Sequence, residues 1–288
     1  MIQDYFLPES VDEALAYLKE KQGSARIIAG GTDLVIEQAQ GKKTAQAWVD
    51  LGSISELGKI TEENEDLIIG ANVTFTQAVT SPLVKQYAPS LAQACRAVGS
   101  LQIRNIGTLA GNVVSANPAA DSTVPLTAMG ATCLVATPQG TREFSMPEMY
   151  AGVLKSSVDS TSQVLTHIKV PKLKKGQSST YIRMEARKAL SLPMLNLAVF
   201  LGLKQDLVEE VRIAVAPVGP GPQLAQEAQD FLIGKPATFE NTEEAARLVA
   251  KSANFRSSPI RGSREYRTQV LPVFARRALD QAVSLARA

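Results

Sequence analysis

The residues best suited to chemistry begin with a glycine-rich stretch, RIIAGGTDLV at residues 26–35, which we call the first glycine segment. An apolar run stops at Gly30 and Gly31, and the small polar residues Thr32 and Asp33 follow directly. Glycines leave backbone N–H groups accessible, and such groups at the end of a strand can bind phosphate oxygens. The alternative is an ordinary tight turn, because Gly-Gly often ends a strand.

The second glycine segment, RNIGTLAGNVVSANPAADS at residues 104–122, has a similar composition. Gly107, Ala110 and Gly111 allow close backbone approach, and a single acid, Asp121, lies near the end. A loop this rich in small polar residues normally lies on the surface, yet apolar residues recur through it, which indicates burial against a ligand. An acid in this place can accept a hydrogen bond from a ribose or ribityl hydroxyl. The further small polar side chains are Thr108, Asn112, Ser115 and Asn117.

Several kinds of site are disfavoured by what the sequence lacks. Neither glycine segment contains the G-x-G-x-x-G fingerprint, so a Rossmann nucleotide site is not supported. Cys95 and Cys133 are the only cysteines, whereas an iron–sulfur cluster usually takes four. The single histidine, His167, lies in an alternating run and is expected to be an ordinary strand residue. A metal site is therefore not expected on this chain.

The bulk properties are those of a globular protein. The chain has 288 residues, 45% hydrophobic and 20% charged, with a formal net charge of +2. Acidic and basic residues are mixed, so neither nucleic acid nor an anionic membrane is an expected partner. No apolar stretch approaches the roughly 20 residues of a membrane span, and the first residues do not resemble a signal peptide. A cytoplasmic location is expected.

Periodic patterns predict an α+β protein built in three regions, at residues 1–55, 56–171 and 178–288. A helix at residues 9–21 has Ser10 as its cap and Glu13 three residues later. Pro82 and Pro89 separate helical pieces within residues 74–98, and Pro272 is expected to kink or split the last helix. Strands are expected at residues 26–31, 45–51, 66–75, 163–171, 179–187, 195–203 and 208–218, with a hairpin at 131–146 and further helices at 223–232, 243–254 and 264–287.

Together the motifs AGGTDL and RNIGTLAGNVVSANPAADS resemble the motif pair of the FAD-binding medium subunits of molybdenum hydroxylases. This is the xanthine dehydrogenase and carbon monoxide dehydrogenase family. The resemblance extends over essentially the whole chain and includes FRSSPIRGSREYR at residues 255–267. It implies a two-subdomain FAD-binding fold of the vanillyl-alcohol-oxidase (PCMH) type at residues 1–55 and 56–171. A smaller α+β domain with a three-stranded sheet and helices would follow at 178–288.

The resemblance also implies a role for individual residues in FAD binding. The first glycine segment would surround the pyrophosphate, and the second would form another cradle. Asp121 would hold a polar group of the cofactor, Leu165 would pack near the flavin, and Arg183 would place a cation near the isoalloxazine edge. The implied cofactor-binding residues are Ile27, Ile28, Ala29, Gly30, Gly31, Thr32, Asp33, Leu34, Thr108, Leu109, Ala110, Gly111, Asn112, Asp121, Leu165 and Arg183.

Two departures from the family pattern are visible. Ala110 stands where relatives usually have the first of two adjacent glycines, and its methyl group fits only a negative φ. Residues 189–198, ALSLPMLNLA, lack the acidic residue that many relatives carry after the basic strand. Covalent flavin attachment is not expected, because neither glycine segment contains a histidine, tyrosine or cysteine.

The function implied by the resemblance is electron transfer within a heteromeric complex. A large subunit would oxidise the substrate at its molybdenum cofactor, a small subunit would carry two [2Fe–2S] clusters, and FAD on this chain would reduce NAD⁺ or another acceptor. No side chain is assigned as a catalytic acid or base, because the chemistry belongs to the flavin. The alternatives are a stand-alone FAD-dependent oxidoreductase and a non-catalytic scaffold. Residues 101–105 and 191–195, apolar yet loop-like, are expected at the partner interface.

Overall fold

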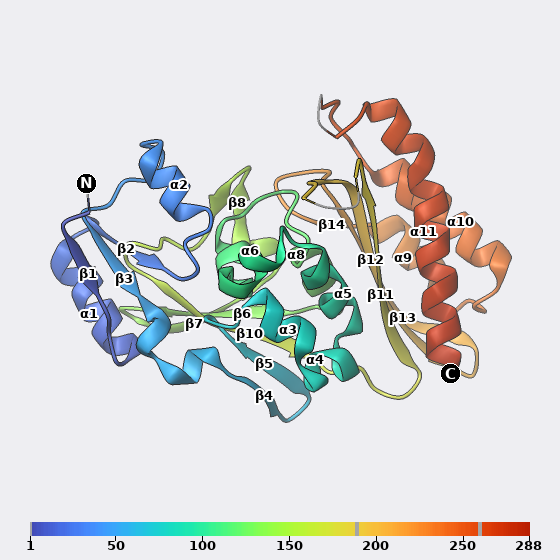
Figure 1. Ribbon diagram of the computed structural model, residues 1–288. Helices are drawn as coiled ribbons and strands as arrows, with labels where there is room; N and C mark the ends of the chain where they lie inside the picture. Colours follow the sequence, from blue (N-terminus) through green and yellow to red (C-terminus); the bar gives the residue numbers. More distant parts are fainter. Residues whose placement is uncertain (1, 188–189, 259–260) are drawn as a thin grey trace.

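The computed structural model describes residues 2–187, 190–258 and 261–288. Its first layer is a parallel sheet in the order β1-β3-β2, covered by helix α1 (Figure 1). As predicted, Ser10 caps α1: its Oγ accepts a hydrogen bond from the Glu13 N–H at 3.1 Å. The elements are β1 (Asp4–Phe6), α1 (Val11–Lys21), β2 (Ala25–Ile28), α2 (Leu34–Ala39), β3 (Ala47–Asp50), η1 (Leu51–Ser53) and η2 (Ser55–Gly58).

The second layer is a five-stranded antiparallel sheet in the order β4-β5-β10-β6-β7. The predicted hairpin and the strand that contains His167 are both present, and His167 is a half-buried residue of β10. The edge strand β4 was not predicted. The elements are β4 (Ile60–Glu63), β5 (Asp66–Gly70), β6 (Thr132–Thr137), β7 (Gly140–Ser145), η3 (Pro147–Met149), β8 (Tyr150–Gly152), β9 (Lys155–Ser156) and β10 (Val164–Pro171).

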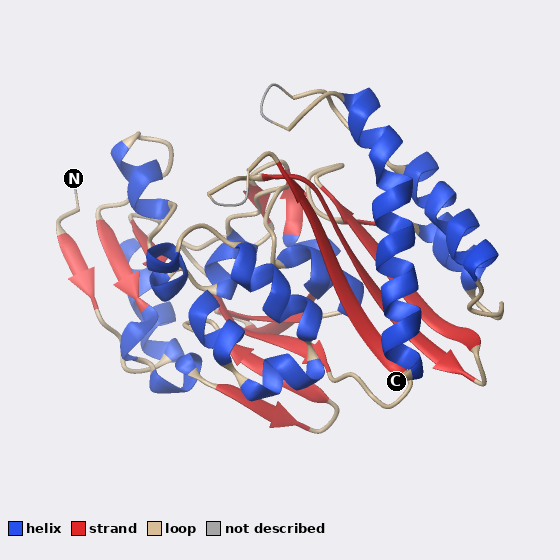
Figure 2. Cartoon of the chain, turned by 45° about the vertical axis from the view of Figure 1, so that its right-hand side comes forward, coloured by secondary structure: helices blue, strands red, loops and turns tan. Residues whose placement is uncertain are grey.

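Six short helices connect β5 to β6 and gather between the first strands and the long strands of the third sheet (Figure 2). Pro82 and Pro89 each begin a helix, which confirms the predicted breaks. The prediction of a loop at residues 104–122 is wrong in part, because Thr108 caps a helix there. Residues 101–105 are also helical rather than loop-like. The helices are α3 (Phe75–Thr80), α4 (Pro82–Tyr87), α5 (Pro89–Ala97), α6 (Leu101–Ile106), α7 (Leu109–Val114) and α8 (Thr123–Met129).

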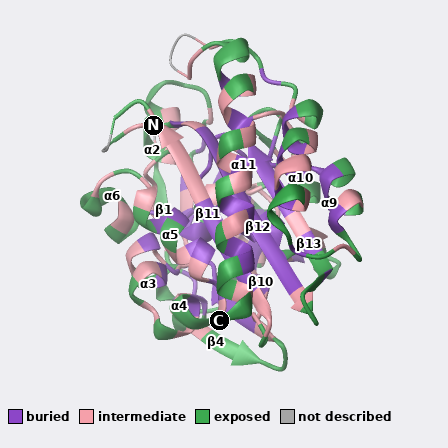
Figure 3. Ribbon diagram, turned by 90° about the vertical axis from the view of Figure 1, so that its right-hand side faces the viewer, coloured by how far each residue is buried: buried purple, intermediate pink, exposed green. Residues whose placement is uncertain are grey.

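The third layer is an antiparallel sheet in the order β11-β12-β13-β14. The three predicted strands are present, and the two-residue β14 adds a fourth. Pro272 was expected to kink or split the last helix, and it does not split it, since α11 continues through Pro272 and packs across the buried sheet (Figure 3). The elements are β11 (Gln177–Glu185), β12 (Pro193–Lys204), β13 (Leu207–Ala216), β14 (Gln223–Leu224), α9 (Gln226–Leu232), α10 (Phe239–Ser252) and α11 (Arg264–Arg287).

The central strand of this third sheet is buried on both faces. Leu197, Val199 and Leu201 of β12 share a core with α11, whereas Ala198 lies in a small cluster with Val124 of α8. Alternation of side chains along a strand explains this division. The first two layers and the connecting helices form one large core of their own. No helix within the described ranges is long and apolar enough to span a membrane.

Candidate functional site

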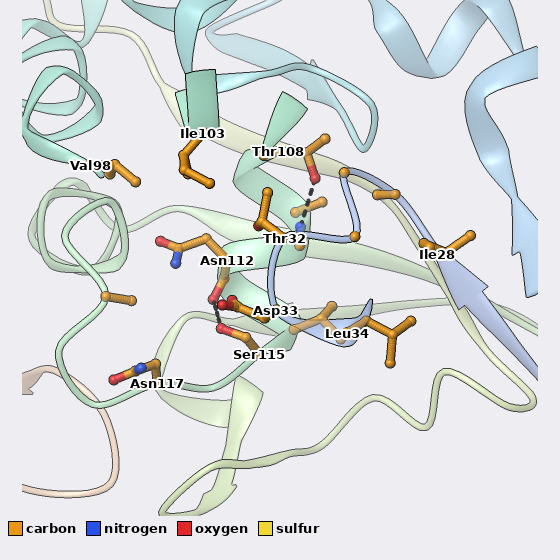
Figure 4. Close-up of a pocket in the computed structure, with 18 of the residues that line it drawn as sticks. Ile28, Thr32, Asp33, Leu34, Val98, Ile103, Thr108, Asn112, Ser115 and Asn117 are labelled. Carbon is orange, nitrogen blue, oxygen red and sulfur yellow. Dashed lines mark hydrogen bonds between the residues drawn. The ribbon is translucent and has the colours of Figure 1, made fainter. Parts of the chain in front are cut away.

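A cavity of about 430 Å³ brings the two glycine segments together (Figure 4). It extends from Arg26 on β2, past both segments, to Leu190, Ser191 and Leu192 in the connection between β11 and β12. Three layers therefore contribute to one site. Of the sixteen residues implied by sequence, those that line the cavity are Ile27, Ile28, Ala29, Gly30, Gly31, Thr32, Asp33, Leu34, Thr108, Ala110, Gly111, Asn112, Asp121 and Leu165.

The first glycine segment presents unpaired backbone donors to this cavity. Among the described residues, none accepts a hydrogen bond from the N–H groups of Gly31, Thr32 or Asp33. Gly31 has a φ of +65°, which turns the chain sharply between β2 and α2 and favours glycine. Consecutive free N–H groups in a turn form a concave nest for an anion. This geometry suits phosphate oxygens.

The two glycine segments touch each other at Gly30. A Cβ atom at Gly30 would lie 2.0 Å from the carbonyl oxygen of Ile106, so no larger residue fits without moving the backbone. At Gly31 a Cβ would meet side chains instead, at 3.1 Å from Val35 and 3.2 Å from Ile28. Gly30 is therefore required for the close contact of the two segments, and Gly31 for its backbone conformation.

In the second glycine segment, more of the backbone N–H groups are already hydrogen-bonded within the protein. Thr108 Oγ1 accepts a hydrogen bond from the Gly111 N–H at 3.0 Å, and the Leu109 N–H donates to the Val73 carbonyl at 3.1 Å. Leu109 is fully buried in the large core and does not line the cavity, unlike its sequence neighbours. Ala110 lies inside α7, where a methyl group is tolerated, and not among the residues of positive φ.

Asp121 lines the cavity but is held by the protein itself. Its Oδ1 accepts hydrogen bonds from the Tyr181 hydroxyl and from Arg183 Nε, both at 2.7 Å. Burial raises the pKa of the Asp121 carboxyl, while Arg183 and the Tyr181 hydroxyl oppose that rise. The pair is a buried, hydrogen-bonded ion pair.

Arg183 itself does not line the cavity. Besides binding Asp121, its guanidinium donates to the carbonyl of Ser191 and pairs with Glu185. It therefore positions Asp121 and the cavity residue Ser191, and its charge is compensated by two carboxylates. The sequence-based placement of a free cation at this point is not supported by these contacts.

Toward the end opposite Arg26, three exposed apolar side chains line the cavity, and we call them the apolar rim: Ile103 of α6, and Leu190 and Leu192 in the β11–β12 connection. Leu190 is 61% exposed and Leu192 is 49% exposed, whereas Leu101 and Ile106 are exposed on α6 but do not line the cavity. The second predicted interface segment, residues 191–195, divides into exposed Leu192 and fully buried Leu195. Of residues 189–198, which lack the family's acidic residue, Ala189 lies outside the described residues. Pro259 and Ile260 of the C-terminal motif also lie outside them.

The other end of the cavity is polar, and the sequence-based site residues did not include its side chains. Arg26, Ser160 and Gln163 line it, together with the partly exposed ion pair of Lys43 and Glu37 at 3.0 Å. The buried Nε of Arg26 has no hydrogen-bond partner in the part of the chain that the structure describes. Only Arg26 gave a signal in the sequence, because it is the first residue of the first glycine segment; the others are brought in by the fold.

This arrangement fits an elongated dinucleotide such as FAD. Unpaired N–H groups are available for a pyrophosphate, an apolar rim adjoins one end, and an unpaired guanidinium lies at the other. The cavity wall combines apolar and glycine residues with polar side chains such as Thr32, Asn112 and Asn117, which suits a large cofactor that has both apolar rings and polar groups. The described residues thus provide what the cofactor requires.

Comparison with known proteins gives the same result. Residues 1–173 match the family model described as the FAD binding domain in molybdopterin dehydrogenase, and residues 180–282 match the CO dehydrogenase flavoprotein C-terminal domain. The glyceraldehyde dehydrogenase medium chain of Sulfolobus acidocaldarius is 28% identical, and the match covers 96% of this chain and 97% of the relative. The putative xanthine dehydrogenase FAD-binding subunit of Escherichia coli is 27% identical, with 91% and 90% covered.

Solved structures agree with the sequence matches. A chain of carbon monoxide dehydrogenase from Hydrogenophaga pseudoflava superposes with a TM-score of 0.91 at 26% identity, covering 99% of this chain and 98% of that one. The likeness therefore includes all three layers. This chain belongs to the FAD-binding medium subunits of the molybdenum hydroxylase family, which are subunits of oxidoreductases.

Proposed function

We propose that this subunit takes electrons from [2Fe–2S] clusters on a partner chain and passes them through its FAD to NAD⁺ or another acceptor. The observation that carries the proposal is the asymmetry of the cavity, which is polar at one end and bordered by the exposed apolar rim at the other. Bound FAD supplies both hydride and single-electron chemistry. The described residues contain no group of three or more potential metal ligands. The clusters would therefore belong to another chain.

The residues of this chain bind and orient the cofactor rather than move protons. The free N–H groups of Gly31, Thr32 and Asp33 would hold the pyrophosphate. The Asp121–Arg183 pair fixes the wall near Ser191, so that the flavin edge would meet the apolar rim. Among the described lining residues there is no histidine, cysteine or tyrosine, which supports non-covalent attachment. Acid precipitation should then leave all flavin in the supernatant, and a yellow pellet would contradict this.

The electron path can be tested with NADH as the only reductant. NADH should bleach the flavin absorbance of the isolated FAD-loaded subunit under anaerobic conditions. In the complex purified from the native host, NADH should also produce the electron paramagnetic resonance signal of reduced [2Fe–2S] clusters. Absence of bleaching would exclude NAD⁺ as the acceptor. Bleaching without a cluster signal in the complex would contradict the transfer between subunits.

The apolar rim is proposed as the surface that meets the small [2Fe–2S] subunit. Exposed apolar patches of this kind mark interaction sites more often than random surface. Leu192→Glu should weaken assembly with the small subunit and change the free energy of unfolding of the isolated chain by less than about 0.5 kcal/mol. Leu285 on α11 is equally exposed, at 49%, so Leu285→Glu is a matched control that should assemble normally. Equal assembly of both variants would remove the rim from the interface.

A large molybdenum subunit and a cytoplasmic location complete the proposal. The substrate would be oxidised on the large subunit, so the described residues do not specify it. The stand-alone oxidoreductase predicts substrate turnover without partner chains, and the scaffold predicts a colourless purified chain. The unpaired donors along the first glycine segment favour the flavoprotein over the scaffold, since an empty loop has no need of them.

A further inference from the structure

Arg26 is a cation that the cavity wall leaves without a partner. Its buried Nε–H has no hydrogen-bond acceptor among the described residues, and the guanidinium forms no ion pair within that part of the chain. Lys43, the other basic residue on this wall, is paired with Glu37 at 3.0 Å. A buried donor without an acceptor costs free energy, which a ligand can recover by supplying one.

Neighbouring groups that could have paired with Arg26 are engaged elsewhere. Asp159 is close enough for its charge to interact with Arg26, but its carboxylate accepts hydrogen bonds from Thr161 and Ser162. The same loop is fixed to β2, because the Ile27 N–H donates to the Ser160 carbonyl at 2.9 Å. The polar end of the cavity is therefore a formed site with one cation left for a ligand.

The position of Arg26 on β2 places it at the end of the cavity that the adenosine half of FAD would reach. Figure 1 shows β2 on the left, α6 in the centre and the β11–β12 region on the right, and the cavity passes through all three. The proposed function places the isoalloxazine at the apolar rim and the pyrophosphate at the first glycine segment. The remaining half of FAD, the adenosine, must then extend toward β2.

We propose that Arg26 binds the adenosine half of FAD and makes this subunit select FAD over FMN. A guanidinium is planar, can stack on an adenine ring and can donate to ring nitrogens or ribose oxygens at the same time. This inference rests on the proposed orientation of the flavin. It concerns only the adenosine end, so it can fail while FAD binding and electron transfer both hold.

The structure also provides a reporter for this end. Trp48 is the only tryptophan of the chain, and it lies directly opposite Arg26 in the register of β2 and β3. ADP carries the adenosine half without a flavin, so quenching by flavin absorption does not interfere. ADP added to the full chain, after FAD removal, should change the Trp48 fluorescence and compete with FAD.

The test compares three ligands on matched variants. Arg26→Met should weaken ADP and FAD binding about ten- to a hundredfold, the range for a lost hydrogen bond to a charged group, and leave FMN binding within about twofold. Lys42→Met is the control, because Lys42 is exposed and absent from the lining but loses the same charge. Lys42→Met should keep the preference for FAD over FMN that the wild type has.

Each outcome decides the assignment. Equal loss of FAD and FMN affinity, or a response to ADP that survives in Arg26→Met, would overturn it. Loss of FMN affinity alone would show that Arg26 faces the flavin instead. If Arg26→Met does not fold, Arg26→Gln and Arg26→Lys answer the same question: the preference for FAD should fall in the first and be partly kept in the second.

Discussion

The two glycine segments are similar in composition but differ in how much of their polar surface is left for a ligand. In the first, the N–H groups of Gly31, Thr32 and Asp33 have no acceptor among the described residues. In the second, Thr108 satisfies the Gly111 N–H, and Asp121 is held by Tyr181 and Arg183. Small polar residues thus serve two purposes here. We therefore propose that the first segment binds the cofactor and that the second mainly builds the wall against which the cofactor lies.

The largest effect is expected when the basic partner of a carboxylate that lines the cavity is removed. The two carboxylates compared are those of Asp121 and Glu37. Arg183→Met leaves a buried Asp121 carboxylate without its cation and should cost about 3 to 5 kcal/mol of unfolding free energy. Lys43→Met removes the partner of Glu37 in a partly exposed pair and should cost less than about 1 kcal/mol. Urea unfolding at neutral pH measures both. Equal costs would show that the Asp121–Arg183 pair contributes no more to stability than the partly exposed Glu37–Lys43 pair on the same cavity wall.

A smaller effect is expected from adding one methyl group to a glycine of each segment. Gly30→Ala places a Cβ 2.0 Å from the Ile106 carbonyl oxygen. It should lower the free energy of unfolding by about 3 kcal/mol, and the variant should no longer retain FAD. Gly111→Ala lies within α7, with only Thr108 Oγ1 near at 3.0 Å, and should change stability by about 1 kcal/mol or less. The measurements are unfolding by urea and flavin absorbance per chain after gel filtration. Retention of FAD by Gly30→Ala would contradict the close contact of the segments.

A modest effect on stability is expected from removing the helix cap in the second segment. Thr108→Val removes the acceptor for the Gly111 N–H and should cost about 1 kcal/mol. Thr238 caps α10 in the same way, far along the chain and outside the cavity lining. Thr238→Val should lower stability by a similar amount without changing FAD affinity. If Thr108→Val also leaves FAD affinity unchanged, the cap has no role in shaping the cofactor wall.

Sequence patterns predicted most of the helices whose first residues include a capping side chain or a proline. The α1 cap at Ser10 and the helix starts at Pro82 and Pro89 follow from chemistry confined to one or two turns. The α7 helix was missed because Gly111, Asn112 and the β-branched Val113 weaken its helical pattern, and its start depends on the Thr108 cap. Edge strand β4 has three exposed residues of four and therefore little apolar periodicity.

The site was predicted where it is contiguous in sequence and missed where the fold assembles it. The first glycine segment lines the cavity continuously from Arg26 to Leu34. Arg183 was assigned to the flavin from its place in the chain, but sequence does not reveal the pairings with Asp121 and Glu185 that engage its charge. Likewise Pro272 does not divide α11, because burial of Leu271 and Ala275 against the sheet outweighs one missing hydrogen bond.

The contact between Gly30 and the Ile106 carbonyl has a consequence for exchange of gene segments among relatives. The two sides of this contact are separated by more than seventy positions in the chain, yet their backbones must match closely. A chimera joined anywhere between them combines one parent's loop with the other parent's helix end. Recombination should therefore be tolerated at junctions after residue 122, where both sides come from a single parent, and rejected at junctions between residues 35 and 104.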